Sequence, residues 1–194
     1  TDGSTQTRTH NAQNEITGIS GAVTPTYDAN GNLTRDEIGR QFIYDAWDRL
    51  VEVRDGSGVT LKRYAYDGLH RRISETAGGV TIDLYYSDGW QVLEERVSGQ
   101  AQVQYVWSPV YVDALVLRDR DTDGDGTLDE RLWVAQDANY NVTVIFDNAG
   151  NVVERYLYDP FGSVTVLDAD WNVQSGGSAY NWNYLHQGGR FDVT

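Results

Sequence analysis

The sequence predicts an all-β fold: a strip of stacked antiparallel β-hairpins that curves or spirals as part of a shell or a fibre. Three observations predict it. Turn signals, Gly or Asp-Gly, interrupt the chain about every ten residues, which leaves no room for helices of ordinary length. β-branched and aromatic residues fill the intervals, and these residue types favour strands. Tyr-type positions recur at 27, 44, 66, 86 and 105, a period of about twenty that fits one hairpin per repeat.

The composition narrows the class of protein. The 194 residues carry a net charge of −14, from 29 acidic and 15 basic side chains, and include no Cys and no Met. A surface this acidic disfavours nucleic-acid binding, and the absence of Cys excludes disulfides and thiolate sites. No apolar run is long enough for membrane insertion. The missing Met and the polar run at residues 1–14 indicate a piece of a larger protein, for which we expect a secreted or cell-surface location.

The chain divides into four parts. Residues 1–24 carry weak signals and are expected to form an irregular N-terminal segment. Residues 25–118 hold hairpins with Tyr-Asp corners, 119–130 form an acidic loop, and 131–194 return to hairpins. Within the second part, residues 27–33 form a turn that feeds a strand, residues 42–53 repeat this unit, and further strands are expected at 59–66, 71–75, 80–86, 91–97 and 101–107.

The repeated corner has a local explanation. Side chains alternate along a strand, so Tyr64 and Tyr66 share one face. The Asp that follows each Tyr can accept a backbone N–H two residues on, which closes an Asx-turn, and a nearby Gly supplies a positive φ. The same aromatic spacing recurs at Phe42/Tyr44, Leu84/Tyr86, Tyr105/Trp107 and Tyr156/Tyr158, the turn glycines are Gly31, Gly68 and Gly89, and arginines expected to pair with turn aspartates of neighbouring repeats (Asp45, Asp48, Asp67) are Arg49, Arg71 and Arg72.

These residues carry a resemblance to a known family. The recurring Tyr-Asp-x-x-Gly-Asn/Arg-Leu pattern resembles the YD-repeat, or RHS, family. Residues 136–162 resemble the start of its repeat-associated core, with the hallmark Asp-x-x-Gly-x-Val…Tyr-x-Tyr-Asp-Pro-Phe-Gly. The core pattern has Gly where this chain has Tyr140, and the later segment at which toxin members cleave themselves is not among these residues. No self-cleaving residue is therefore carried over.

The resemblance implies a fold and two kinds of role. In the family, such repeats form a long β-strip that spirals into a hollow shell. The shell encloses a C-terminal toxin in bacterial polymorphic and insecticidal toxins, and it forms an extracellular adhesion body in animal teneurins. An enclosed C-terminal toxin is accordingly one expected partner.

The acidic loop is the one stretch with the ligands for a chemical site. Ca²⁺ prefers six to eight oxygen ligands, and alternate acids on a curling loop supply them. Starting at Asp119, the stretch matches Asp-x-Asp-x-Asp-Gly-x5-Glu in full, with Glu130 as the closing ligand. Starting at Asp121, the hydrophobic eighth position falls on Leu128, but position twelve, which should hold the closing ligand, falls on Leu132. Both registers use the central acids, and a solvated acidic turn without metal is the alternative. The candidate metal ligands are Asp119, Asp121, Asp123, Asp125, Thr127, Asp129 and Glu130.

Catalysis finds little support, and we predict that the segment is not an enzyme. No Gly-x-Ser-x-Gly elbow surrounds any Ser. Glu94 and Glu95 are neighbours that point to opposite faces of a strand, so solvated acids are expected there. Three aromatics at Tyr180, Trp182 and Tyr184 share one face of an expected strand, which suits a buried stripe or a sugar-stacking platform. His10, His70 and His186 fit surface or packing roles.

The function expected from these features is structural. The segment would form a β-shell or a self-associating extracellular assembly with a calcium-stabilised loop. Because an open strip leaves strand edges unpaired, other copies or neighbouring segments of the same protein are expected to pair with them. The alternatives are an encapsulating shell of a polymorphic toxin and a carbohydrate-binding adhesin.

Overall fold

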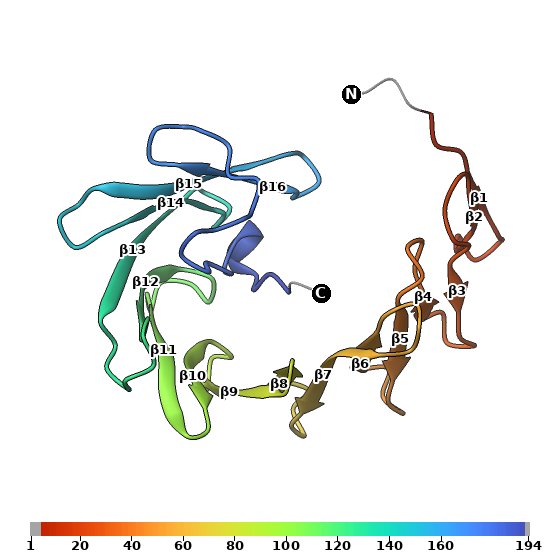
Figure 1. The fold of residues 1–194 in the computed structure, drawn as a ribbon, viewed down its shortest axis with the longest axis horizontal. Helices are drawn as coiled ribbons and strands as arrows, with labels where there is room; N and C mark the ends of the chain where they lie inside the picture. Colours follow the sequence, from red (N-terminus) through yellow and green to blue (C-terminus); the bar gives the residue numbers. More distant parts are fainter. Residues whose placement is uncertain (1–4, 193–194) are drawn as a thin grey trace. The chain divides into compact units, whose positions relative to one another are not determined.

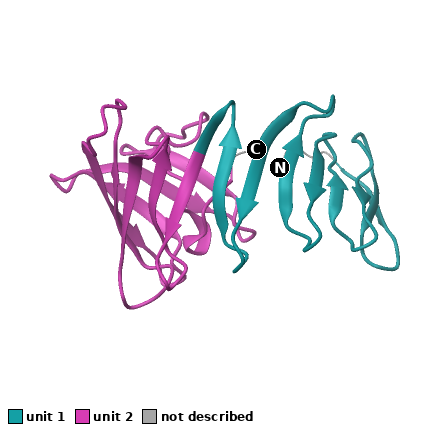
Figure 2. Cartoon of the chain, turned by 90° about the horizontal axis from the view of Figure 1, so that it is seen from below, with its two compact units in different colours: residues 1–81, 194 teal, residues 82–193 magenta. Residues whose placement is uncertain are grey.

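The computed structural model describes residues 5–192, and it confirms the all-β prediction. Residues 1–4 of the predicted irregular segment and residues 193–194 of the last part lie outside the described residues. The chain forms two compact units that meet in sequence at Thr81 and Ile82 (Figure 2). No helix in the described part is long and apolar enough to cross a membrane.

Unit 1 begins with a small sheet of its own. Strands β1 (Arg8–His10) and β2 (Ile16–Ile19) pair antiparallel, with a register shift between Thr9 and His10. The segment expected to be irregular therefore contains a short bulged hairpin. Each of the following strands pairs antiparallel with the next: β3 (Thr26–Tyr27), β4 (Leu33–Arg35), β5 (Gln41–Tyr44), β6 (Leu50–Arg54), β7 (Thr60–Tyr66) and β8 (Arg72–Ala77).

Unit 2 continues the same up-and-down order and then adds an irregular C-terminal segment. Its strands are β9 (Val80–Tyr86, which starts just before the unit boundary), β10 (Val92–Val97), β11 (Gln100–Trp107), β12 (Leu115–Arg120), β13 (Glu130–Gln136), β14 (Val142–Phe146), β15 (Val152–Tyr158) and β16 (Val164–Asp168). Residues 174–192, here called the C-terminal strap, follow and include the 3-10 turn η1 (His186–Gly188). Figure 1 shows β10–β15 curving around this strap.

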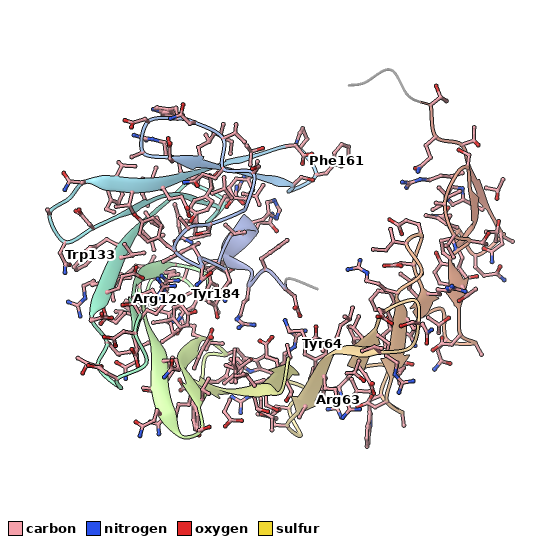
Figure 3. All side chains as sticks on the ribbon, in the orientation of Figure 1. Arg63, Tyr64, Arg120, Trp133, Phe161 and Tyr184 are labelled. Carbon is pink, nitrogen blue, oxygen red and sulfur yellow. The ribbon has the colours of Figure 1, made fainter. Side chains whose placement is uncertain are left out.

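The core of unit 2 lies between the strands and the strap. Tyr156, Ile145 and Val142 from the strands are buried together with Trp182 and Tyr184 from the strap. Figure 3 shows Tyr184 on the inner side of the strands. The strap thus covers the apolar face that an isolated curved sheet would expose to water.

The aromatic pairs share a face as predicted, and their second members have an additional role. In β7, Tyr64 is buried and Tyr66 is half-buried, while Ala65 between them is exposed. The Tyr66 hydroxyl donates to the carbonyl of Leu50 at 2.8 Å, on the first residue of β6. Tyr44, Trp107 and Tyr158 reach back in the same way to the carbonyls of Leu33, Val92 and Val142.

The corners are Asx-turns, as predicted, but the positive φ lies at the fourth residue of each turn. In the Asp28 turn this residue is Gly31, with φ of 87°. In the turn that starts at Asp67 it is His70 (65°), and in the turn that starts at Ser87 it is Trp90 (69°). The prediction of positive φ for Gly68 and Gly89 was therefore wrong, because Gly68 comes two residues, and Gly89 one residue, before the fourth position of its turn.

Candidate functional site

The acidic loop lies between β12 and β13, and the strand register decides its length. Asp119 pairs with Arg131 across the two strands, and Arg120 pairs with Glu130. Only residues 121–129 are left to form the loop. The two outer acids of the longer predicted calcium register, Asp119 and Glu130, are thus strand residues.

Both outer acids are bound to arginines. Two nitrogens of Arg131 contact the two carboxylate oxygens of Asp119, each at 2.7 Å. Glu130 accepts from Arg118 at 2.7 Å and from Arg120 at 3.1 Å. A metal ion in the longer register would have to break these ion pairs, so the geometry favours the register that starts at Asp121.

The structure brings three of the predicted ligands together. Asp121, Asp123 and Asp125 each offer one carboxylate oxygen, and these oxygens lie within 4.8 Å of one another. Asp121 is buried, whereas the other two are exposed. Gly124 and Gly126 have φ of 83° and 90°, a conformation that glycine adopts without strain and that curls the loop around Asp121.

Backbone N–H groups hold Asp121 in place. Its Oδ1 accepts from Gly124 at 2.7 Å, and its Oδ2 accepts from Gly126 at 2.9 Å. Burial opposes ionisation, but these N–H donors keep the pKa of Asp121 below its ordinary value. Asp129 binds the backbone N–H and the hydroxyl of Thr122 and so closes the loop at its base. Thr127 donates its N–H to Asp125 at 2.7 Å.

The second notable cluster is a set of buried charged residues beneath the strap. Glu154 on β15 is fully buried, and its carboxylate accepts from the Ser178 hydroxyl at 2.6 Å and from the Ala179 N–H at 2.9 Å. The Tyr156 hydroxyl also donates to it. These hydrogen bonds offset the cost of burying the carboxylate.

Arg118 on β12 binds the middle of the strap. Its side chain is 2% exposed and donates to the carbonyls of Tyr180 at 2.9 Å and Asn181 at 3.1 Å. The guanidinium also lies 4.9 Å from the ring centre of Trp182. Burial lowers the pKa of Arg118, although an arginine remains protonated in proteins.

Glu95 on β10 binds the end of the strap. It accepts from the Tyr105 hydroxyl at 2.9 Å and from Arg190 at 3.3 Å. Burial, followed by the Glu95 carboxylate, raises the pKa of Tyr105 well above its ordinary value, so this tyrosine remains a donor. Glu95 is only 5% exposed, which corrects the prediction of a solvated acid. The cause is a register shift between Val92 and Glu94 that turns both Val92 and Glu95 inward.

The predicted sugar platform is also corrected. Residues 180–184 do not form a strand; the segment has one isolated bridge, between Tyr184 and Arg190. Trp182 is 5% and Tyr184 4% exposed, so neither ring offers a free face. His10, His70 and His186 lie in β1, a turn and η1, respectively.

Arginine pairing follows a different rule from the one predicted. Arg49 and Arg71 bind Asp45 and Asp67 of their own turns, at 2.7 and 2.8 Å, not those of neighbouring repeats. A link between neighbouring turns exists as well, since Arg49 donates to the carbonyl of Asp67 at 3.2 Å. The guanidinium carbon of Arg72 also lies over the ring of Tyr64, 4.0 Å from the ring centre.

Comparison with known proteins finds sequences similar to this chain. The family model for the RHS Repeat matches residues 27–60 and 44–81. Residues 27–81 of the chain thus match RHS repeats. Similar curated proteins are the tRNA3(Ser)-specific nuclease WapA of Bacillus spizizenii, 29% identical over 184 residues, and the tRNA nuclease WapA of Bacillus subtilis, 28% identical over 184 residues. Each match covers 92% of this chain but only 7% of the relative.

Solved structures share this fold. The crystal structure of TcdB2-TccC3-Cdc42 matches 86% of this chain and 8% of its own, with a TM-score of 0.60 at 17% identity. The Photorhabdus luminescens Tc holotoxin pore with the mutation TccC3-D651A matches 82% of this chain and 10% of its own, with a TM-score of 0.53 at 15% identity. These likenesses concern the fold alone.

One RHS corner of this chain departs from the family pattern in a way the structure explains. Tyr140 occupies the turn position where the core pattern has Gly, and its φ is 61°. Its ring stacks on Tyr111, with centroids 4.5 Å apart and planes 19° apart. This ring contact offsets the strain that a side chain experiences at positive φ.

Proposed function

We propose that this chain is a structural, non-catalytic wall segment of a larger secreted or surface-exposed RHS protein. The supporting observation is the use of its acids. The turn aspartates accept the backbone N–H groups two and four residues on, as Asp45 does from Trp47 and Arg49. The buried acids Glu95 and Glu154 bind the strap. These carboxylates are therefore engaged in building the wall.

An enclosed C-terminal toxin is the partner that this wall fits best. The curated relatives are named as tRNA nucleases, and this chain corresponds to 7% of their length. We assign the wall to this segment, and a toxic activity to residues elsewhere in the longer protein. The carbohydrate-binding alternative loses its main support, because Trp182 is buried.

The test uses the longer gene product that contains this segment. If the segment is part of an enclosing wall, the C-terminal part of that product should resist added protease until the wall is opened. Replacing Glu154 by Gln weakens the hydrogen bonds that hold the strap at Ser178 and Ala179. This substitution should therefore make the C-terminal part cleavable. Equal cleavage of the C-terminal part in both proteins from the outset would contradict the proposal.

We also propose that the acidic loop binds Ca²⁺ through Asp121, Asp123 and Asp125 and acts as a clip between β12 and β13. The closeness of three carboxylate oxygens supports this reading. So does the chemistry of the ligands, since Ca²⁺ prefers oxygen donors from flexible acidic loops. A bound ion would offset the repulsion among the three acids, so removing Ca²⁺ should lower the unfolding temperature.

A further inference from the structure

An arginine joins two successive corners on one edge of unit 1. The corners start at Asp45 and Asp67 and follow β5 and β7. Arg49 binds the carboxylate of Asp45 at 2.7 Å and donates to the carbonyl of Asp67 at 3.2 Å. Its guanidinium also lies 5.0 Å from the ring centre of Tyr66. The space between these corners thus holds a guanidinium, with oxygens of both corners and one tyrosine ring around it.

Two corners of unit 2 have the same arrangement. They start at Asp137 and Asp159, follow β13 and β15, and are likewise successive corners on one edge. The tyrosine before the second corner makes the same hydrogen bond in both pairs. Tyr158 donates to the carbonyl of Val142, the first residue of β14, as Tyr66 does to the first residue of β6. The two pairs of corners therefore correspond residue by residue.

The position of the arginine is taken by an asparagine in unit 2. Asn141 comes four residues after Asp137, so it corresponds to Arg49. Its Nδ2 donates to Asp137 at 2.8 Å, and its Oδ1 accepts the N–H of Gln187 from the strap at 2.9 Å. Both polar atoms of this side chain are thus engaged away from Asp159.

A groove of about 500 Å³ lies between these two corners. Its walls include Asp137, Asp159, the ring of Tyr158 and, from the strap, His186. Hydrogen bonds, first of all from the residue four positions after each Asp, keep the pKa of Asp137 and the pKa of Asp159 below their ordinary value. Both carboxylates are therefore negative at neutral pH, and they lie where the other pair of corners holds a guanidinium.

The arginines of unit 2 do not neutralise these two carboxylates. Residues 82–193 carry 18 acidic and six basic side chains. In the described part of this unit, each base is engaged at another place: Arg96 with Glu94, Arg118 and Arg120 with Glu130, Arg131 with Asp119, Arg190 with Glu95, and Arg155 over the ring of Trp171. The groove thus keeps two negative charges that unit 2 does not compensate.

The groove also borders on apolar surface. Pro160 lines it, and the neighbouring Phe161 is 94% exposed (Figure 3). A segment that binds here should therefore carry apolar residues beside its charged one. A second copy of this chain is a poor candidate, because two molecules that each carry a net charge of −14 repel one another.

We propose that this groove binds an arginine side chain of a separate, basic polypeptide. The guanidinium lies between Asp137 and Asp159 and over the ring of Tyr158, as Arg49 does between its own two corners. An arginine suits this site better than a lysine, because its planar guanidinium donates in several directions and stacks on aromatic rings. The two corners are already fixed by their own hydrogen bonds, which lowers the entropic cost of binding.

NMR on the isotope-labelled 194-residue chain tests the proposal with the peptide acetyl-Gly-Leu-Arg-Leu-Gly-amide. The peptide should shift the backbone amide signals of Asn139, Asn141 and Thr143 at the groove. The same peptide with citrulline in place of arginine has nearly the same shape but no charge. It should bind about fivefold more weakly, the loss expected for a partly exposed ion pair. Added salt should weaken only the arginine peptide.

Asp137→Asn and Asp159→Asn should each weaken binding of the arginine peptide about fivefold. Asparagine can still accept the N–H groups that close these corners, and circular dichroism verifies that each variant folds. Asp147→Asn is the matched control. Its corner has the same hydrogen bonds, with Asn151 in the corresponding position, but it lies on the opposite edge, so binding should not change.

Three results would overturn the proposal. The first is a groove whose amide signals do not move at millimolar concentrations of the arginine peptide. The second is equal binding of the arginine and citrulline peptides. The third is an equal loss of binding in Asp147→Asn and in Asp137→Asn. Each of them leaves the protease test of the wall untouched, because that test does not depend on this groove.

Discussion

The carboxylate of Asp36 binds both the backbone N–H and the side chain of Arg40. One carboxylate oxygen of Asp36 accepts the backbone N–H of Arg40 at 2.8 Å, and the other accepts its Nε at 2.7 Å. The first oxygen also accepts the N–H of Ile38 at 3.1 Å. The same double contact recurs at other corners whose fourth residue after the Asp is Arg or Asn, such as Asp67 with Arg71 and Asp28 with Asn32.

The first prediction concerns this contact. Asp36 is 3% exposed, so replacing it by Ala removes three hydrogen bonds from a buried site. We expect a loss of about 2–3 kcal/mol in the free energy of unfolding, measured by urea titration. Glu37→Ala removes an exposed acid from the neighbouring position and should change stability little. Equal effects of the two substitutions would contradict the turn-closing role.

The second prediction concerns the stability of the chain at low pH. Arg54 and then Thr60 lower the pKa of Glu52 to about 2, from an ordinary value of 4.5, and hydrogen bonds lower the pKa of turn acids such as Asp45. A lowered folded pKa means that the folded state binds protons less tightly than the unfolded state. Stability should therefore be constant from neutral pH to about 5 and fall as the pH drops further.

Urea midpoints measured at a series of pH values test this dependence. Glu52→Gln should reduce the slope between its ordinary pKa of 4.5 and about 2, because the variant has no proton to bind there. A wild-type profile that is flat down to pH of about 2 would show that the acids contribute no pH-dependent stability.

The third prediction concerns the strap. Glu154→Gln places an amide N–H₂ among three hydrogen-bond donors, so at least one buried donor loses its partner. We expect about 2–3 kcal/mol of destabilisation, with faster hydrogen exchange concentrated in residues 178–190. The exposed Glu37→Gln is the charge-matched control. Faster exchange spread evenly over both units would argue against a specific role of Glu154 in holding the strap.

The fourth prediction concerns Tyr140. Replacing it by Gly removes the strain of a positive φ but also the ring contact with Tyr111. Replacing it by Ala removes the contact and keeps the strain. Tyr140→Gly should therefore be more stable than Tyr140→Ala by about 1 kcal/mol, as measured by thermal unfolding. Equal stability would mean that the turn relaxes to accommodate a side chain.

The fifth prediction concerns the acidic loop. Ca²⁺ should raise the unfolding temperature of the chelator-treated chain, and Asp123→Asn should abolish this shift because it removes one of three clustered carboxylates. Asp170→Asn, which removes the same charge from another exposed turn of unit 2, should leave the shift intact. An unchanged midpoint with and without Ca²⁺ would refute the calcium clip.

The features that sequence predicted well are local. The alternation of Tyr64, Ala65 and Tyr66 and the Asx-turn at Asp67 depend on residues within one hairpin, so their spacing is sufficient. Glu154 could have been found by the same logic, since it alternates with Tyr156 and Tyr158 on the inner face. Its partners could not, because Ser178 and Ala179 come from a segment with no periodic pattern.

The sequence singled out the clustered acids of the candidate metal site, but it did not decide between the two registers of the loop. Both readings contained Asp121, Asp123 and Asp125, and the choice between them depends on how β12 pairs with β13. Cross-strand pairing sets the ends of a loop, and single-strand patterns do not determine it. The inward turn of Glu95 escaped prediction for a similar reason, because a bulge shifts the alternation within β10.

The strap also sets an order in which unit 2 can be completed during synthesis. Strands β10–β15 leave the ribosome before residues 178–190, yet Glu95, Arg118 and Glu154 find part of their hydrogen bonding only in those later residues. Until they arrive, the inner face combines exposed aromatic surface with partly unpaired charges. A chain that stops at β16 would remain in that state, with aromatic surface that favours aggregation.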